Sequence, residues 1–190
     1  MAGKKLKIMV ASSVYGFETE VAQLCGVLTT YGYEVFNSHI GTIRKPAGVS
    51  NTRACLDAVA HSDLFFGIIR PYYGSGITHK EIKEAIRLDT PRWFVAHAYV
   101  TFLRQMFKQY RFNDDGTRKA IPSIIYRKTA VMDDLRVIDM YDDAIRADKP
   151  ANERDWAQPY FHFNELLTYV ETTFKDIQWI RQQCTGGKAS

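Results

Sequence analysis

The chain of 190 residues carries a mild formal net charge of +4, with 46% hydrophobic and 24% charged residues. This composition is that of an ordinary globular domain, and it excludes a disordered or fibrous chain. No block of Lys and Arg is long enough for a nucleic-acid-binding arm, and no apolar run approaches membrane-spanning length.

The predicted elements of the first half alternate between apolar strands and amphipathic helices. Strands are predicted at residues 6–11, 33–40, 64–69 and 93–96, and helices at 17–31, from Ser50 and from Thr78. Residues 8–10 and 64–69 are continuously apolar, which is typical of strands covered on both faces. This order predicts an α/β fold with a doubly wound parallel sheet, helices on both faces and right-handed crossovers.

The second half is less regular. A helix is predicted over residues 99–110, a turn at 113–116, a fifth strand at 136–141, a long loop over 146–160 and a final helix over 161–183. Residues 121–134 are ambiguous, with a short strand possible at 123–126. We expect a single domain over residues 1–184, with an insertion at about 99–135 and a flexible tail at 185–190.

The cysteines and histidines indicate neither a disulfide framework nor a metal site. Cys25, Cys55 and Cys184 are odd in number and form no CxxC pair. The histidines show neither HxxxH nor HExxH spacing. Because the first residues also lack the pattern of a secretory signal, we expect a soluble cytoplasmic protein without a metal or other cofactor.

Polar and aromatic side chains follow the predicted strands at their carboxyl ends. These ends open on one rim of a parallel sheet, where open α/β folds bind ligands. Aromatic rings can stack on a base, whereas helix N-termini and arginine can hold phosphate. The candidate ligand-binding residues are Ser12, Ser13, Tyr15, Phe17, Asn37, Arg70, Tyr72, Tyr73, Gly74, Ser75 and Thr78. Together they suit a nucleoside or a dinucleotide.

Glu81 has two roles open to it. A glutamate delivered into the rim crevice can support chemistry at a glycosidic bond. The spacing Thr78-x-x-Glu81 is also that of a capping box, and from spacing alone this structural role ranks first. Arg70 has a structural alternative as an ion-pair partner of Asp63 or Glu81. His79 is expected to be a surface histidine, with assistance in a proton transfer as the alternative.

Several common catalytic motifs are missing. The chain has no GxSxG elbow, which disfavours a serine hydrolase. It also has no GxGxxG and no GxxxxGK[ST], which disfavours Rossmann redox chemistry and P-loop phosphoryl transfer.

The segments SSVYGFE at 12–18, SDLF at 62–65, GIIRPYYGSG at 67–76 and PRW at 91–93 carry a family resemblance. Over about residues 7–110 the chain resembles a bacterial family catalogued as a domain of unknown function, whose members are often linked to defence-type NTPases. It is more distantly similar to TIR domains and nucleoside 2-deoxyribosyltransferases. That similarity implies a flavodoxin-like, TIR-like sheet of five strands, with a catalytic glutamate at the position of Glu81.

Two functions follow as expectations. The resemblance implies an N-glycosidic-bond hydrolase or transferase acting on NAD-like dinucleotides or nucleosides, in bacterial antiphage defence signalling. It also implies self-association and a defence effector protein as partner. The alternative is a non-catalytic nucleotide-sensing or assembly module, in which Glu81 serves only as a capping residue.

Overall fold

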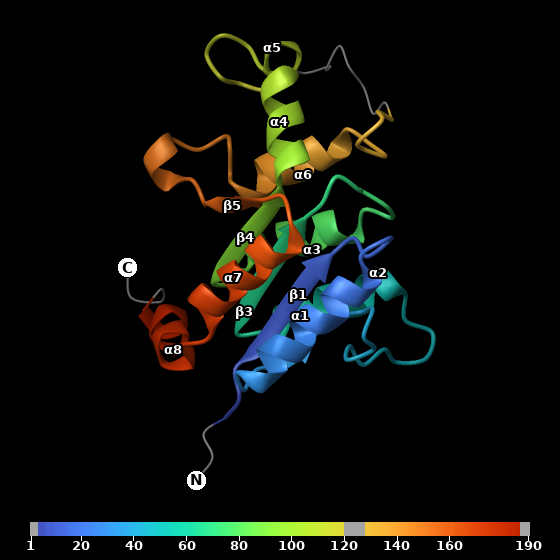
Figure 1. Ribbon diagram of the computed structural model, residues 1–190, viewed down its shortest axis with the longest axis vertical. Helices are drawn as coiled ribbons and strands as arrows, with labels where there is room; N and C mark the ends of the chain where they lie inside the picture. The colour runs from blue at the N-terminus through green and yellow to red at the C-terminus, as the bar shows by residue number, and fades with distance from the viewer. Residues whose placement is uncertain (1–3, 120–127, 187–190) are drawn as a thin grey trace.

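The computed structural model describes residues 4–119 and 128–186. Its strands are β1 (Lys7–Ser12), β2 (Glu34–Phe36), β3 (Leu64–Ile69), β4 (Arg92–His97) and β5 (Ala157–Tyr160). They form one sheet in the order β2-β1-β3-β4-β5 (Figure 1), and every neighbouring pair is parallel. This flavodoxin-like arrangement confirms the predicted doubly wound α/β fold.

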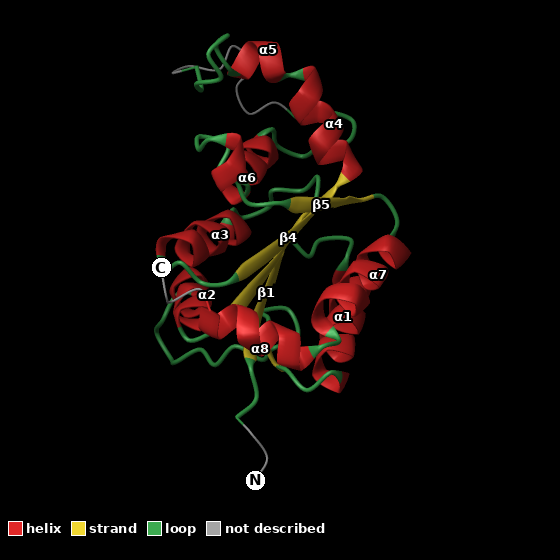
Figure 2. Ribbon diagram, turned by 90° about the vertical axis from the view of Figure 1, so that its left-hand side faces the viewer, coloured by secondary structure: helices red, strands yellow, loops and turns green. Residues whose placement is uncertain are grey.

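Helices cover both faces of the sheet, as the continuous apolar strands predicted. The helices are α1 (Glu18–Thr30), α2 (Asn51–Ala60), α3 (Ile77–Arg87), α4 (Ala98–Met106), α5 (Lys108–Arg111), α6 (Arg136–Ala144), α7 (Phe163–Phe174) and α8 (Ile177–Gly186), with a 3-10 turn at Ala151–Glu153. Core residues of α1, α7 and α8 pack on one face, and those of α2, α3, α4 and α6 pack on the other. Figure 2 shows α1 and α7 on one side of the sheet and α2, α3 and α6 on the other. Successive residues of β1 alternate between the two cores: Ile8 and Val10 face the first, Met9 and Ala11 the second.

The predicted fifth strand at 136–141 is wrong, because this segment forms α6. Val137, Met140 and Ala144 are buried at helical spacing. The six residues 136–141 are too few for the sequence pattern to distinguish this helical period from the two-residue period of a strand. The fifth strand lies instead at 157–160, inside the predicted loop. β5 pairs only with β4, and an edge strand of this kind tolerates Pro159, which lacks a backbone N–H.

Two predicted helices are each divided in the structure. The final helix, predicted over 161–183, ends at Phe174 and restarts at Ile177 as α8. The Asp176 carboxylate causes the restart, because it accepts the backbone N–H groups of Gln178 and Trp179, each at 3.0 Å. The helix predicted over 99–110 is divided at Phe107 into α4 and α5.

The strand predicted over 33–40 is shorter than expected, because β2 ends at Phe36. The Asn37 side chain turns the chain there. Its carbonyl oxygen accepts the N–H groups of His39 and Ile40, and its amide donates to the Val10 carbonyl at 2.9 Å.

The segment expected as an insertion, 99–135, contains α4 and α5 and is tied to the sheet through α6. Asp142 of α6 is fully buried, and its carboxylate pairs with Arg104 at 2.5 Å and with Arg111 at 3.5 Å. A buried carboxylate needs such cationic partners, so both helices are fixed where they leave the body of the protein.

The remaining sequence expectations concern the ends of the chain and the stretch 123–126. The possible strand at 123–126 lies outside the described residues. The expected tail begins within α8, which reaches Gly186. Within the described part of the chain, no helix combines the length and apolar character needed to cross a membrane.

Gly67 in β3 gives a test of the packing at the centre of the sheet. A Cβ atom at this position would lie 2.7 Å from Cδ1 of Phe94, so Gly67→Ala is expected to lower the free energy of unfolding by about 1–3 kcal/mol. Gly26 on α1 has nothing within 4 Å of a Cβ, and Gly26→Ala is the matched control that should be neutral or stabilising. Urea unfolding measures both, and equal stabilities would contradict the packing described here.

Candidate functional site

A cavity of about 240 Å³ opens between the carboxyl ends of β1 and β3. The chain leaves β1 toward α1 on one face of the sheet and leaves β3 toward α3 on the other. This divergence is the topological switch point at which open α/β sheets bind ligands. The cavity is lined by residues 10–15, 37–38 and 72–75, and by Ile77, Thr78 and Glu81.

Glu81 lies at this cavity with only 3% of its surface exposed. Burial raises the pKa of its carboxyl to about 7, although a hydrogen bond with the Cys55 thiol acts in the opposite direction. Cys55 belongs to α2, and burial, followed by the nearby Glu81, raises the pKa of its thiol to about 12. A carboxyl group with such a pKa can change its charge near neutral pH.

The capping-box role expected for Glu81 is not what the structure shows. α3 begins at Ile77, and its N-cap is Gly76, so Glu81 is not three residues after the cap. The cap makes no side-chain hydrogen bond. The Glu81 carboxyl instead faces α2, where Cys55 is its hydrogen-bond partner.

The loop between β3 and α3 is shaped by glycines and by Asp133. Gly76 has a φ of 74°, and a Cβ at this position would lie 2.9 Å from the Tyr73 ring. Only glycine therefore fits beneath that ring without strain. The Asp133 carboxylate accepts the backbone N–H groups of Tyr73 at 2.6 Å and Gly74 at 3.1 Å. Asp133 could not be found from local sequence patterns, because it lies 59 residues away from Gly74.

A chain of hydrogen bonds runs from this loop to α6. The Tyr73 hydroxyl lies 3.0 Å from Nδ1 of His79, and Nε2 of His79 lies 2.8 Å from the Asp143 carboxylate. Burial raises the pKa of Asp143, but hydrogen bonds from His79 and Arg118 outweigh this and hold it well below its usual range. The expectation of a surface histidine is wrong, since His79 is buried between α3 and α6.

Arg70 has a structural role beside the cavity, where it contacts the loop after β1. Its guanidinium donates to the carbonyl oxygens of Ser13 and Tyr15, each at 2.9 Å, and lies 4.4 Å from the centre of the Phe17 ring. Neither Asp63 nor Glu81 is its partner; Asp63 accepts the backbone N–H of Lys7 at 2.8 Å. Arg70 therefore ties the end of β3 to the loop after β1.

The structure brings most of the predicted site residues to one cavity. Those that line it are Ser12, Ser13, Tyr15, Asn37, Tyr72, Tyr73, Gly74, Ser75, Thr78 and Glu81. Arg70 and Phe17 do not line it, and Phe17 is part of the core. Cys55 and Asp133 are contacts of the site that the sequence did not indicate.

Hydroxyl groups and tyrosine rings dominate the cavity wall. The Ser13 hydroxyl donates to the Tyr72 carbonyl and is thereby committed to the fold, as is the Asn37 side chain. The Tyr15 ring is 69% exposed and stacks on Tyr72, with ring centres 5.0 Å apart. Among residues 4–119 and 128–186, no three His, Cys, Asp or Glu side chains group closely enough to hold a metal ion.

The burial of Glu81 predicts a pH-dependent effect of Glu81→Gln on stability. The folded-state pKa of about 7 lies above the ordinary value of 4.5, so the wild type loses stability as pH rises through this interval. Gln stays neutral and avoids that loss. The stability advantage of the variant is expected to grow by about 2 kcal/mol between pH 5 and pH 8.5.

Urea unfolding at the two pH values measures this difference. Glu84 lies one turn further along α3, where it pairs with Arg87 at 2.7 Å, so Glu84→Gln is a matched control without such an advantage. A pH-independent difference between wild type and Glu81→Gln would show that the carboxyl keeps an ordinary pKa.

Comparisons with known proteins place the chain in a family. No curated protein matches the sequence. The fold is similar to a crystal structure of a conserved protein from Enterococcus faecalis V583, with 13% sequence identity and a TM-score of 0.45, covering 89% of this chain and 99% of that one. The sequence matches the family described as "Domain of unknown function (DUF4062)" over residues 7–172. The chain therefore belongs to this family.

Proposed function

We propose that the protein cleaves or transfers across an N-glycosidic bond of a nucleoside or an NAD-like dinucleotide, with Glu81 as the catalytic residue. One observation carries this proposal: a buried carboxyl, with its pKa raised to about 7, lies at a hydroxyl-lined cavity at the switch point of the sheet. The resemblance of the Gly74–Glu81 segment to the loops of TIR domains and nucleoside 2-deoxyribosyltransferases supports it.

The size of the cavity suggests how such a substrate would lie. A volume of about 240 Å³ is below the range of about 300–1,000 Å³ of ordinary ligand pockets, so it suits a ribosyl group and not a whole dinucleotide. The stacked pair of Tyr15 and Tyr72 beside it presents an aromatic surface for the base. The hydroxyls of Ser12, Ser75 and Thr78 lie where they can contact the hydroxyls of the sugar.

The chemistry requires Glu81 in its ionised form. As the bond between C1′ and the base nitrogen breaks, the electron pair leaves with the base and positive charge develops on the sugar ring. The Glu81 carboxylate stabilises that charge, or attacks C1′ to form a glycosyl ester. Water or another hydroxyl acceptor then forms the new bond at C1′, and where an ester had formed, its bond to C1′ breaks and the Glu81 carboxylate is released. The acceptor proton passes to the departed base or to water.

The same resemblance extends the proposal to the setting of the reaction. We place the protein in the cytoplasm, as a self-associating component of bacterial antiphage defence that acts with an effector protein. The cavity is lined by residues of one chain, so self-association is not needed to complete it.

A non-catalytic nucleotide-sensing or assembly module is the second candidate. The hydrogen bond between Glu81 and Cys55 favours this second candidate. A carboxyl that is bonded to another side chain is less available to react with a ligand in the cavity. On this alternative the cavity binds a nucleotide and leaves the glycosidic bond intact.

The catalytic proposal is tested by following NAD and nucleosides with the purified protein by chromatography. Glu81→Gln is expected to lower the turnover rate by at least about 100-fold, because the variant lacks the charge that stabilises the transition state. Glu84→Gln, on the same helix, is expected to keep the rate.

The pH profile provides a second readout. kcat/KM is expected to rise about tenfold per pH unit below the Glu81 pKa of about 7 and to level off above it. Binding of a nucleotide by calorimetry, with no product at any protein concentration, would favour the sensing module. Full activity of a folded Glu81→Gln variant would refute the role of this residue.

A further inference from the structure

A second groove lies along the edge strand β2, away from Glu81. It has a volume of about 940 Å³ and is lined by the start of β1, by β2, by the loop after β2 and by α2. β2 is bonded to β1 on one side only, so its other side faces this groove. An unpaired edge of this kind is a template for an added strand.

The backbone of β2 is oriented for such pairing. The Glu34 N–H donates to the Leu6 carbonyl at 2.9 Å, toward β1. Alternate residues of a parallel strand point their N–H and C=O groups to opposite sides, so those of Val35 face the groove. A peptide lying along β2 can therefore form main-chain hydrogen bonds with Val35.

The groove has an apolar floor. Phe36 and Ile43 pack partly buried against the second core cluster, and Ala58 of α2 is buried beside them. Val35, Pro46 and Ala54 complete the apolar part of the lining. Such a floor can cover the apolar side chains of a bound segment.

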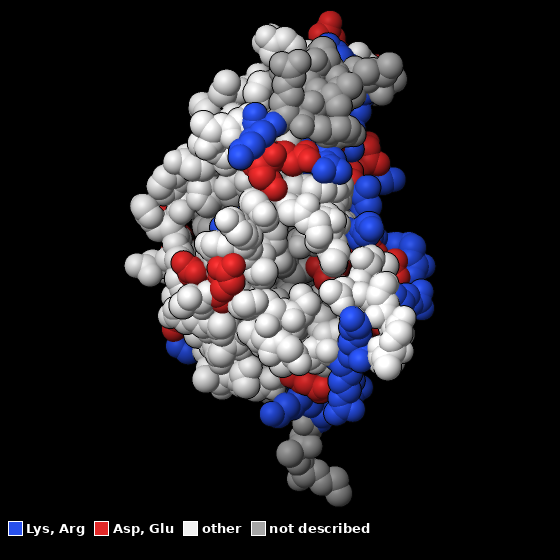
Figure 3. Space-filling model, turned by 90° about the vertical axis from the view of Figure 1, so that its right-hand side faces the viewer, with Lys and Arg blue, Asp and Glu red and all other residues white. Residues whose placement is uncertain are grey.

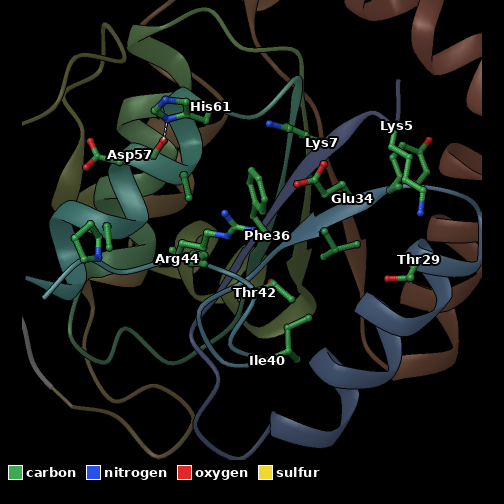
Figure 4. Close-up of a pocket in the computed structure, with 16 residues that line it drawn as sticks. Lys5, Lys7, Thr29, Glu34, Phe36, Ile40, Thr42, Arg44, Asp57 and His61 are labelled. Atoms are coloured by element: carbon green, nitrogen blue, oxygen red, sulfur yellow. Dashed lines mark hydrogen bonds between the residues drawn. The ribbon is translucent and has the colours of Figure 1, made fainter. Parts of the chain in front are cut away.

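The rim of the groove is basic. Lys5, Lys7 and Arg44 line it, and none of the three has an ion-pair partner among the described residues. Lys and Arg side chains gather at the end of this face near the N-terminus (Figure 3). Lys7 and Arg44 lie on either side of the Phe36 ring (Figure 4), and the Lys7 ammonium is 5.8 Å from the centre of that ring.

The acidic residues of the groove do not cancel this charge. Asp57 is paired with Arg53 at 3.0 Å, which leaves Glu34 as the free carboxylate of the lining. Three unpaired cations around an open strand edge select an occupant that carries negative charge.

We propose that this groove binds an extended acidic segment of a partner protein, which adds to β2 as a sixth strand. Main-chain hydrogen bonds to Val35 hold the segment, and an acidic side chain enters between Lys7 and Arg44 above Phe36. A second copy of this chain does not fit as the occupant. Two β2 edges related by a two-fold axis would place the same cations of both copies together.

The test uses a fluorescein-labelled peptide of eight residues that alternates Glu and Val, with binding followed by fluorescence anisotropy. The wild-type protein is expected to bind it and not its Lys-Val counterpart. The double variant Lys7→Glu/Arg44→Glu is expected to weaken binding by about tenfold or more, because both charges are reversed. Lys45→Glu is the matched control, since Lys45 hydrogen-bonds to Asn51 and does not line the groove.

A second peptide, N-methylated at alternate backbone nitrogens, separates strand addition from simple charge attraction. Its affinity is expected to be lower by about tenfold or more, because methylation removes main-chain donors. Equal affinity for the methylated peptide would show an anion site and overturn strand addition. Absence of binding by the folded wild type, or a dimer in sedimentation that the double variant abolishes, would also overturn the proposal. None of these outcomes depends on the chemistry of Glu81.

Discussion

The burial of β3 between β1 and β4 is the constraint on which the candidate site depends. All six of its residues, 64–69, are buried, and Gly67 allows the Phe94 ring to lie against the strand. The register fixed by this packing carries the loop after β3 to the loop after β1, where Arg70 joins them through the Ser13 and Tyr15 carbonyls. The cavity exists because these loops are held together at the point where α1 and α3 diverge.

The same packing produces the electrostatics of Glu81. Because α3 lies against α2, the Glu81 carboxyl has little water around it. Burial therefore favours the neutral form of this carboxyl over the charged form and raises its pKa. This arrangement lowers the free energy of unfolding as the pH rises from the ordinary carboxyl pKa of 4.5 to about 7. Stability is commonly lower at sites that bind or transform a ligand. Asp133, His79 and Asp143 meanwhile hold the neighbouring loop in place.

Two separate regions of the sheet have distinct physical character. The carboxyl ends of β1 and β3 form a small cavity lined by hydroxyls, whereas the β2 edge forms a long groove with an apolar floor and a basic rim. We propose a sugar as the ligand of the first region and an extended acidic segment as the ligand of the second. Phe36 lines the second region and Asn37, the next residue, lines the first, so the two regions adjoin at the end of β2.

The sequence by itself determined the parallel α/β sheet, four of its strands and most residues of the cavity, because apolar runs such as 64–69 and the loops after them are local patterns. Tertiary structure decided what local patterns leave open. Residues 136–141 form a helix that packs against α3 and α4, and residues 157–160 form a strand that pairs with β4. Each assignment depends on partners that are distant in sequence. Tertiary structure also decided the contacts of Glu81 and Arg70. Glu81 contacts Cys55, and Arg70 contacts the carbonyl oxygens of Ser13 and Tyr15. These partners are distant in sequence, and spacing along the chain carries no information about such contacts.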